Sequence, residues 1–134
     1  MRLSTATDYL IWGIIAHLVA DWLLQNDWMA NYKTSLAHPA AWVHGGIQLL
    51  AMWLVFPLKI AAVLGVAHLL VDTRKPLHWW RTVYRQTTDG PVFISFAMWQ
   101  DQAVHICSIA IAAFWMIVFT LNFFVGQSSQ PLIR

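Results

Sequence analysis

Long runs of apolar residues, rather than amphipathic stripes, dominate this 134-residue chain. They extend over residues 9–24, 40–58, 60–71 and 104–125. A helix needs about 20 apolar residues to cross a bilayer, and a composition that is 59% hydrophobic and 10% charged is typical of membrane proteins. A soluble domain of this size buries only about two-thirds of its surface, too little to hide these runs. We therefore predict an all-α integral membrane protein, a four-helix bundle.

The predicted bundle is a single domain that takes in residues 1–134. We expect its transmembrane helices over about residues 9–25, 40–58, 59–73 and 101–125. Between the third and fourth helices, residues 76–100 are rich in basic and aromatic side chains, which is typical of an amphipathic segment lying at the membrane interface. Asp89 is expected to cap a new helix. Because an unbroken helix from Pro91 to Val125 exceeds the membrane core, a break or a tilt is expected near Trp99–Asp101.

Three pairs of His and Asp residues stand one helical turn apart inside or beside the apolar runs. The sequence Ala-His-Leu-Val-Ala-Asp at residues 16–21 recurs as Ala-His-Leu-Leu-Val-Asp at residues 67–72, and Asp101 with His105 repeats the spacing in reverse order. Ionisable groups within a membrane are costly and usually mark a functional site. The repeated pair therefore predicts a site rather than a packing detail.

Helical geometry predicts that these pairs meet. In a bundle whose helices alternate in direction, the ends of the first and third helices share one membrane face with the starts of the second and fourth. Residues three, four and seven apart lie on one side of a helix. The candidate ligands are His17, Asp21, His44, His68, Asp72, Asp101 and His105. The expected surrounding or rim residues are Gln25, Gln48, Lys75 and Gln102. His38 and His78 fall outside the predicted site.

Imidazole and carboxylate groups are ligands for zinc, iron or manganese, and zinc is the expected ion. Seven candidates exceed the needs of one tetrahedral ion, so either some aspartates hydrogen-bond to ligands or two ions share the site. A metal-bound water near the membrane surface suits hydrolysis of an anionic lipid-like substrate, whose headgroup Arg74, Arg81 and Arg85 would contact. No residue is assigned a catalytic role.

Two other functions fit the same residues. As an alternative, the chain is expected to be a non-enzymatic subunit of a larger membrane complex, in which its histidines ligate a haem or chlorophyll-type cofactor. Haem needs two imidazoles on facing helices. His17 with His68, or His44 with His105, would supply them. A proton or ion path is a third reading, since chains of Asp and His are the usual material for one.

The order of motifs resembles a known family. It consists of His17-x3-Asp21-x3-Gln25 with Lys33, then His44, then His68-x3-Asp72 with Lys75, and Asp101-Gln102-x2-His105. This order is similar to short bacterial and phage membrane proteins catalogued as domain of unknown function 3307, and the likeness extends over residues 14–108. The resemblance implies a multi-pass membrane protein of bacterial or phage origin and supplies no activity.

Charge sets the expected location and partners. The net charge of +2 is modest, and the sequence contains no basic stripe, so no nucleic-acid partner is expected. The loops on the site's face hold Lys33, Arg74, Lys75, Arg81 and Arg85, against Arg2, Lys59 and Arg134 opposite. The positive-inside rule therefore predicts that the site lies toward the cytoplasm. With the bacterial origin that the resemblance implies, the expected location is the bacterial inner membrane. Expected partners are membrane lipid, and other proteins or further copies of the chain.

Overall fold

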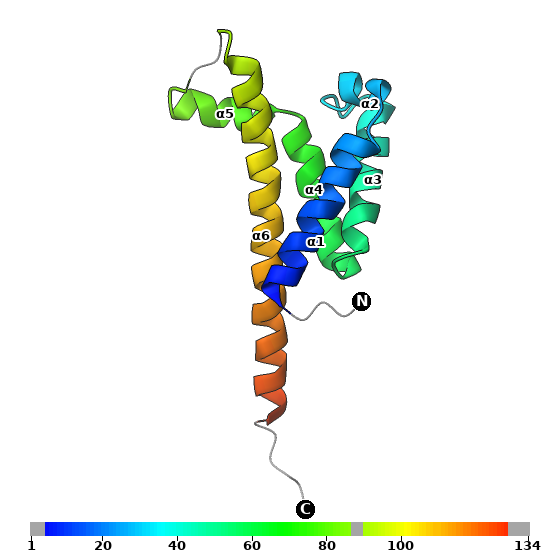
Figure 1. Ribbon diagram of the computed structural model, residues 1–134, viewed down its shortest axis with the longest axis vertical. Helices are drawn as coiled ribbons and strands as arrows, with labels where there is room; N and C mark the ends of the chain where they lie inside the picture. Colours follow the sequence, from blue (N-terminus) through cyan, green and yellow to red (C-terminus); the bar gives the residue numbers. More distant parts are fainter. Residues whose placement is uncertain (1–4, 87–89, 129–134) are drawn as a thin grey trace, which may run out of the picture.

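The computed structural model describes residues 5–86 and 90–128, with side chains up to residue 118, and this part of the chain contains helices and turns without strands. Asp89, expected to cap a helix, lies outside the described residues. The longer helices are α1 (Ala6–Leu18), continued by a π-helical segment (Val19–Leu23), α3 (Pro39–Trp53), α4 (Leu58–Asp72) and α6 (Phe93–Ser128). Two short helices, α2 (Asp27–Tyr32) and α5 (Lys75–Val83), lie at one end of the bundle (Figure 1). The all-α prediction is confirmed.

The longer helices alternate in direction, as the sequence predicted. α1 and α4 run toward the end where α2 and α5 lie, while α3 and α6 start there and run away from it (Figure 1). α1 contacts α3 and α6, and α4 contacts the same two helices. The C-terminal ends of α1 and α4 therefore meet the N-terminal ends of α3 and α6.

The prediction of four transmembrane helices is wrong for the described residues, because three of the helices are too short. By length and composition, only α6 suits a membrane crossing, over Phe93–Val118. α3 and α4 have 15 residues each, which gives about 22 Å of helix against a hydrocarbon core of about 30 Å. Local turns end them early: residues 54–57 form a turn that closes at Pro57, and α4 stops at the left-handed Arg74.

The structure has no break near Trp99–Asp101, where a break or a tilt is expected, and the residues of the expected interfacial segment, 76–100, do not form one continuous segment. α6 runs unbroken for 36 residues, because residues 92–125 contain neither Gly nor Pro to interrupt it. The expected segment is divided between α5 and the first two turns of α6. α5 crosses the end of the bundle (Figure 1), with Leu77 and Arg81 buried and Trp79, Trp80 and Tyr84 exposed.

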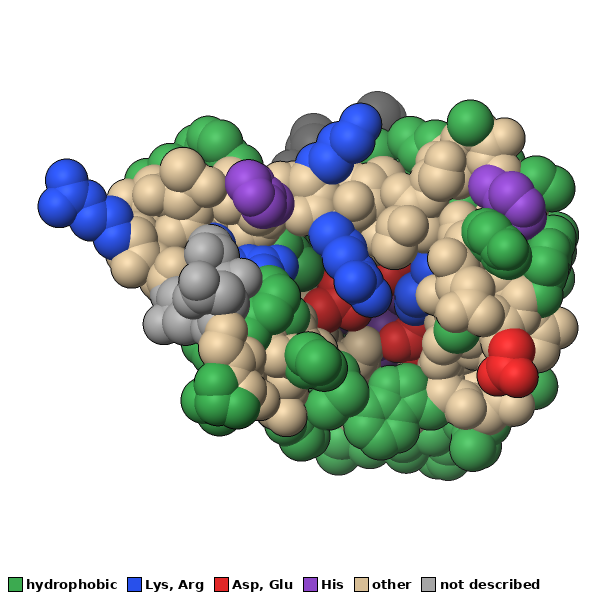
Figure 2. Space-filling model, turned by 90° about the horizontal axis from the view of Figure 1, so that it is seen from above, with side chains coloured by type: hydrophobic (Ala, Val, Ile, Leu, Met, Phe, Trp, Pro, Cys, Tyr) green, Lys and Arg blue, Asp and Glu red, His purple; other side chains and the backbone are tan. Residues whose placement is uncertain are grey.

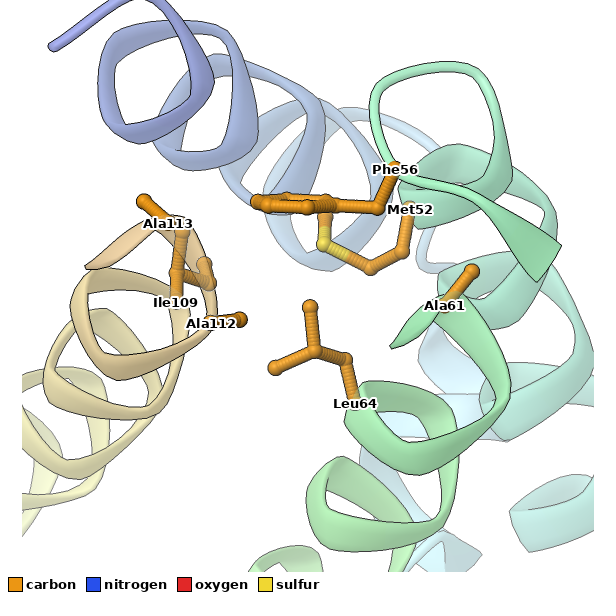
Figure 3. Close-up of a cluster of buried hydrophobic side chains, with 7 residues drawn as sticks. All are labelled: Met52, Phe56, Ala61, Leu64, Ile109, Ala112 and Ala113. Atoms are coloured by element: carbon orange, nitrogen blue, oxygen red, sulfur yellow. The ribbon is translucent and has the colours of Figure 1, made fainter. Parts of the chain in front are cut away.

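The apolar core lies toward the other end of the bundle. Figure 3 shows side chains from α4, α6 and the end of α3 converging there. Its buried members are Met52, Phe56, Ala61, Leu64, Ile109, Ala112 and Ala113. α1 reaches this core at Gly13, where an added Cβ would lie 2.6 Å from a methyl carbon of Ile109. The absence of a side chain thus lets α1 and α6 approach closely.

Candidate metal centre

Buried ionisable side chains meet at the end of the bundle where α2 and α5 lie. Asp21 comes from the π-helical segment, His44 from the second turn of α3, and His68 and Asp72 from the last turns of α4. Each is 5% exposed or less. Seen from this end, acidic side chains lie at the bottom of a hollow with basic side chains around it (Figure 2). We call Asp21, His44, His68 and Asp72 the Asp/His cluster.

One donor atom of each member lies close to those of the others. His44 Nε2 is 3.0 Å from His68 Nε2, 3.1 Å from Asp21 Oδ1 and 3.2 Å from Asp72 Oδ2. His68 Nε2 is 3.1 Å from Asp72 Oδ2 and 3.9 Å from Asp21 Oδ1. Five of the six pairs among these two nitrogens and two oxygens therefore lie within 3.9 Å, and Asp21, His44 and His68 bring donor atoms within 4.8 Å of one another.

These separations are close to those of a tetrahedral metal site. With bonds of about 2.0–2.2 Å, the ligand atoms of a tetrahedral zinc ion lie about 3.3–3.6 Å apart. Asp72 Oδ2 also has no aligned hydrogen-bond donor, although two imidazole nitrogens lie within 3.2 Å of it. An oxygen lone pair that no donor occupies is available to a metal ion. The donor set thus fits a divalent ion such as zinc.

Lys33 lies at the cluster but was not among the predicted site residues, although it belongs to the motif and to the loops on the site's face. It ends α2, and its Nζ lies 2.9 Å from Asp21 Oδ1, 3.3 Å from Asp72 Oδ1 and 3.3 Å from His44 Nε2. Its ammonium group offsets the charge of the two buried carboxylates, and a metal ion entering the cluster competes with it. One signal was available: between Arg2 and Lys59 this is the only basic residue apart from the histidines.

His17 lies beside the cluster, where two glutamines hold it. Its Nε2 is 3.2 Å from Gln102 Oε1 and its Nδ1 is 3.4 Å from Gln48 Oε1. Gln102 Nε2 in turn donates to Asp21 Oδ2 at 2.8 Å. Both partners are amide oxygens, and a neutral imidazole donates from only one ring nitrogen, so one of these two contacts is a hydrogen bond from His17. Because the two glutamines flank both ring nitrogens, His17, Gln48 and Gln102 have the position of supports beside Asp21.

The π-helical segment explains why His17 and Asp21 take different places. Four residues apart in a regular α-helix, they would share one face. The wider turn of Val19–Leu23 re-aims the carboxylate of Asp21 toward His44 of α3, while the His17 ring stacks on His105 of α6 with centroids 5.0 Å apart. Such widened turns are frequent at functional sites. The predicted stripe of residues is thus divided between the cluster and its support.

His105 offers a second, overlapping group of donors. Its Nδ1 donates to the carbonyl of Asp101 at 2.9 Å, and its buried Nε2 has no partner among the described residues. His105, His68 and Asp72 bring donor atoms within 4.8 Å of one another. The carboxylate of Asp101 is 3.9 Å from His105 Nδ1 and partly exposed, and it faces the pocket described below. The predicted two-ion arrangement would share His68 and Asp72.

The predicted pair His17 and His68 does not fit a tetrapyrrole. Imidazoles that ligate haem iron approach it from the two sides of a flat macrocycle. Here the rings of His17 and His68 contact one another directly, with centroids 5.3 Å apart. This spacing leaves no room for a macrocycle between them. The donor set therefore favours a bare ion.

A pocket of about 440 Å³ opens beside the cluster. Asp21, Lys33 and Asp101 line it next to the cluster, and Arg74 and Arg81 line it from the side of α5. In Figure 2 it is the hollow with acidic side chains at its bottom. The buried charges thus reach the exterior through one opening.

The remaining predicted residues lie around or away from this pocket. Gln25 is part of its wall. Lys75 and Arg85 are exposed and do not line it. His38 caps α3 by accepting a hydrogen bond from a backbone amide, and His78 is exposed on α5. Both histidines therefore lie outside the site, as expected.

Comparison with known proteins gives a family without an assigned role. The model of the family described as protein of unknown function (DUF3307) matches residues 9–131. No curated protein and no solved structure matches the sequence. The function of the site has to be argued from its geometry.

Proposed function

Because this chain belongs to the DUF3307 family of unknown function, we propose its role from the site: the Asp/His cluster binds a divalent metal ion, zinc, and the protein is a metal-dependent hydrolase. The observation that carries the proposal is the spacing of the four donor atoms, 3.0–3.2 Å for four pairs and 3.9 Å for a fifth. Two carboxylates balance the charge of one divalent ion. An ion would therefore leave the buried cluster neutral.

The hydrolytic role follows from the pocket. With Asp21, His44 and His68 as its three protein ligands, a zinc ion would keep its fourth position open for a water, whose pKa zinc lowers to about 7 so that it is a nucleophile at neutral pH. Lys33 lies on the pocket side of the cluster, within 3.3 Å of Asp21 Oδ1 and His44 Nε2, which marks the face open to a further ligand. Displaced from the carboxylates, its ammonium group can donate to an oxygen of the substrate. Asp101, in the pocket wall, is placed to accept a proton.

A membrane location is the second element of the proposal. In addition to the length and apolar composition of α6, large apolar side chains are exposed around the bundle, and such contiguous surface usually marks contact with lipid or protein. They include Trp12, Ile15, Leu50, Val63, Val66, Ile111 and Phe114. We place α6 across a bacterial cytoplasmic membrane with the shorter helices embedded against it and the site toward the cytoplasm. Lipid, or a second copy of the chain, would cover the exposed surface.

Metal analysis tests the proposal on the full chain purified in an uncharged detergent. After exposure to zinc and removal of the free ion, the wild type should retain zinc in proportion to protein. His68→Ala should lose it, since this residue belongs to both possible ligand groups. His38→Ala and His78→Ala are matched controls outside the site and should retain it. A wild type without zinc, or a folded His68→Ala variant with undiminished zinc, would overturn the metal centre.

A further inference from the structure

We infer that the pocket beside the Asp/His cluster binds an amphiphile with a phosphate head and one hydrocarbon chain, the phosphate held by Arg81 and Arg74. This amphiphile is the substrate class of the proposed hydrolase, and its hydrolysis rests on the proposed function. The binding itself depends on residues outside the cluster.

Arg81 is the first reason to expect an anion. Its side chain lines the pocket and the residue is only 5% exposed. Its Nε donates to the Leu77 carbonyl at 3.3 Å, and its guanidinium lies over the Phe93 ring at 5.2 Å. Among the residues with described side chains, no carboxylate forms an ion pair with it. A buried guanidinium without a counter-ion is costly, and its planar fork matches the oxygens of a phosphate.

Arg74 gives independent support from its backbone. It has φ of 60° in the left-handed region, which is uncommon for residues other than Gly, Asn and Asp. This strained position, between Asp72 of the cluster and the first turn of α5, places Arg74 in the pocket wall. Such strain concentrates at functional sites. A second guanidinium is thus held near the first.

The wall formed by α6, which adjoins Arg81, gives the site for a hydrocarbon chain. Phe93, Ile94, Ala97 and Met98 of α6 line the pocket, and their spacing places them along one side of that helix. Ile94 is 80% exposed and Met98 is 45% exposed, so the apolar wall continues to the outside of the molecule. A ligand with its phosphate at the arginines can therefore extend its chain along α6.

The relative placement of the two walls favours one molecule that uses both. The pocket is lined by three basic residues, Lys33, Arg74 and Arg81, and by two acidic residues, Asp21 and Asp101. The volume of about 440 Å³ lies within the range of about 300–1,000 Å³ usual for small-molecule sites. Asp21 of the cluster and both arginines line the same pocket, so a phosphate held by the arginines shares this pocket with the proposed hydrolytic centre.

Binding of radiolabelled dodecyl phosphate to the full chain in alkyl maltoside micelles tests this inference. The wild type should bind it saturably, and unlabelled inorganic phosphate should compete only at much higher concentration because it lacks the chain. Arg81→Met should weaken binding about tenfold or more. Arg85→Met is the matched control, an exposed arginine outside the pocket, and should bind as the wild type does. Dodecyltrimethylammonium, with the same chain and the opposite charge, should not compete.

Two further variants keep the test decisive if Arg81→Met does not fold. Arg74→Gly removes the second guanidinium at a φ that glycine adopts freely, so it should fold and bind dodecyl phosphate more weakly. Ile94→Gln should weaken the binding of dodecyl phosphate and leave that of inorganic phosphate unchanged. Undiminished dodecyl phosphate binding in folded Arg81→Met or Arg74→Gly, or equal competition by dodecyltrimethylammonium, would overturn the inference. Zinc content measured on the same samples separates this failure from failure of the metal centre.

Discussion

The two ends of the bundle are made by the same four helices but are stabilised in different ways. At one end, Phe56, Ile109 and their neighbours form an apolar core, where burial of hydrocarbon is the main stabilising contribution. At the other end, Asp21, His44 and Asp72 are buried with mutual charge interactions, whose attraction has to offset a large desolvation penalty. The comparison indicates that the apolar end holds the helices together and that the polar end is retained for function.

The largest expected effect on stability is at the apolar end. Phe56→Ala removes a side chain that is 2% exposed and stacks on Tyr9 with centroids 5.5 Å apart. The free energy of unfolding should fall by about 3–5 kcal/mol, measured by denaturation in an uncharged detergent. Leu54→Ala, at a neighbouring residue that is 88% exposed, should change it little. The zinc content of the folded Phe56→Ala protein should equal that of the wild type; its loss would show that the two ends are not separable.

A loss almost as large is expected at the polar end, but only without metal. Lys33→Met removes the ammonium group from Asp21 and Asp72. In the presence of a chelator the free energy of unfolding should fall by about 3 kcal/mol, because two buried carboxylates lose their counter-ion. Zinc should restore most of this loss, since the ion replaces the ammonium group and no longer competes with it. The exposed Lys75→Met is the control. A Lys33→Met protein that zinc does not stabilise would contradict the metal centre.

A smaller effect is expected where α1 meets α6. Gly13→Ala places a methyl group 2.6 Å from Ile109 Cγ2, so the helices must separate slightly. Overpacking of this kind costs about 1–3 kcal/mol. Gly46→Ala is the matched control, because an added Cβ there has no atom within 4 Å, and this variant should be as stable as the wild type or more so. Equal stability of the two variants would mean that α1 is not tightly packed on α6.

The convergence of the polar residues was predictable from the sequence, whereas the lengths of the helices were not. Alternating helix direction and the His-x3-Asp spacing were enough to bring His44, His68 and Asp72 together. The apolar runs overstated the spans, because composition does not show where the turn before Pro57 closes. The expectation of a break in α6 came from a general argument about membrane thickness. The lack of Gly and Pro in residues 92–125 outweighs that argument.

Side-chain roles within the site were the least predictable feature. The π-helical segment separates His17 from Asp21, and periodicity calculated for a regular helix cannot anticipate such a turn. Lys33 reaches the cluster because Asn26 caps α2 through the amide of Met29, which makes a short helix in what the sequence shows as a polar connection. Both features depend on local hydrogen bonds rather than on hydropathy.

The smallest expected effect concerns backbone strain, which also differs between the two ends. In the described chain, the non-glycine residues with positive φ are Arg74 and Arg85, and they flank α5 at the polar end. Arg85→Gly should relieve the strain of the left-handed conformation at φ of 50°. Because glycine also raises the entropy of the unfolded chain, the net rise in the free energy of unfolding should be only about 0.5–1 kcal/mol. Arg74→Gly should give a similar gain, measured by the same denaturation, but only Arg74→Gly should lose affinity for dodecyl phosphate. If neither variant gains stability, the left-handed turns are unstrained, and the argument from strain to ligand binding at Arg74 fails while that from burial of Arg81 stands.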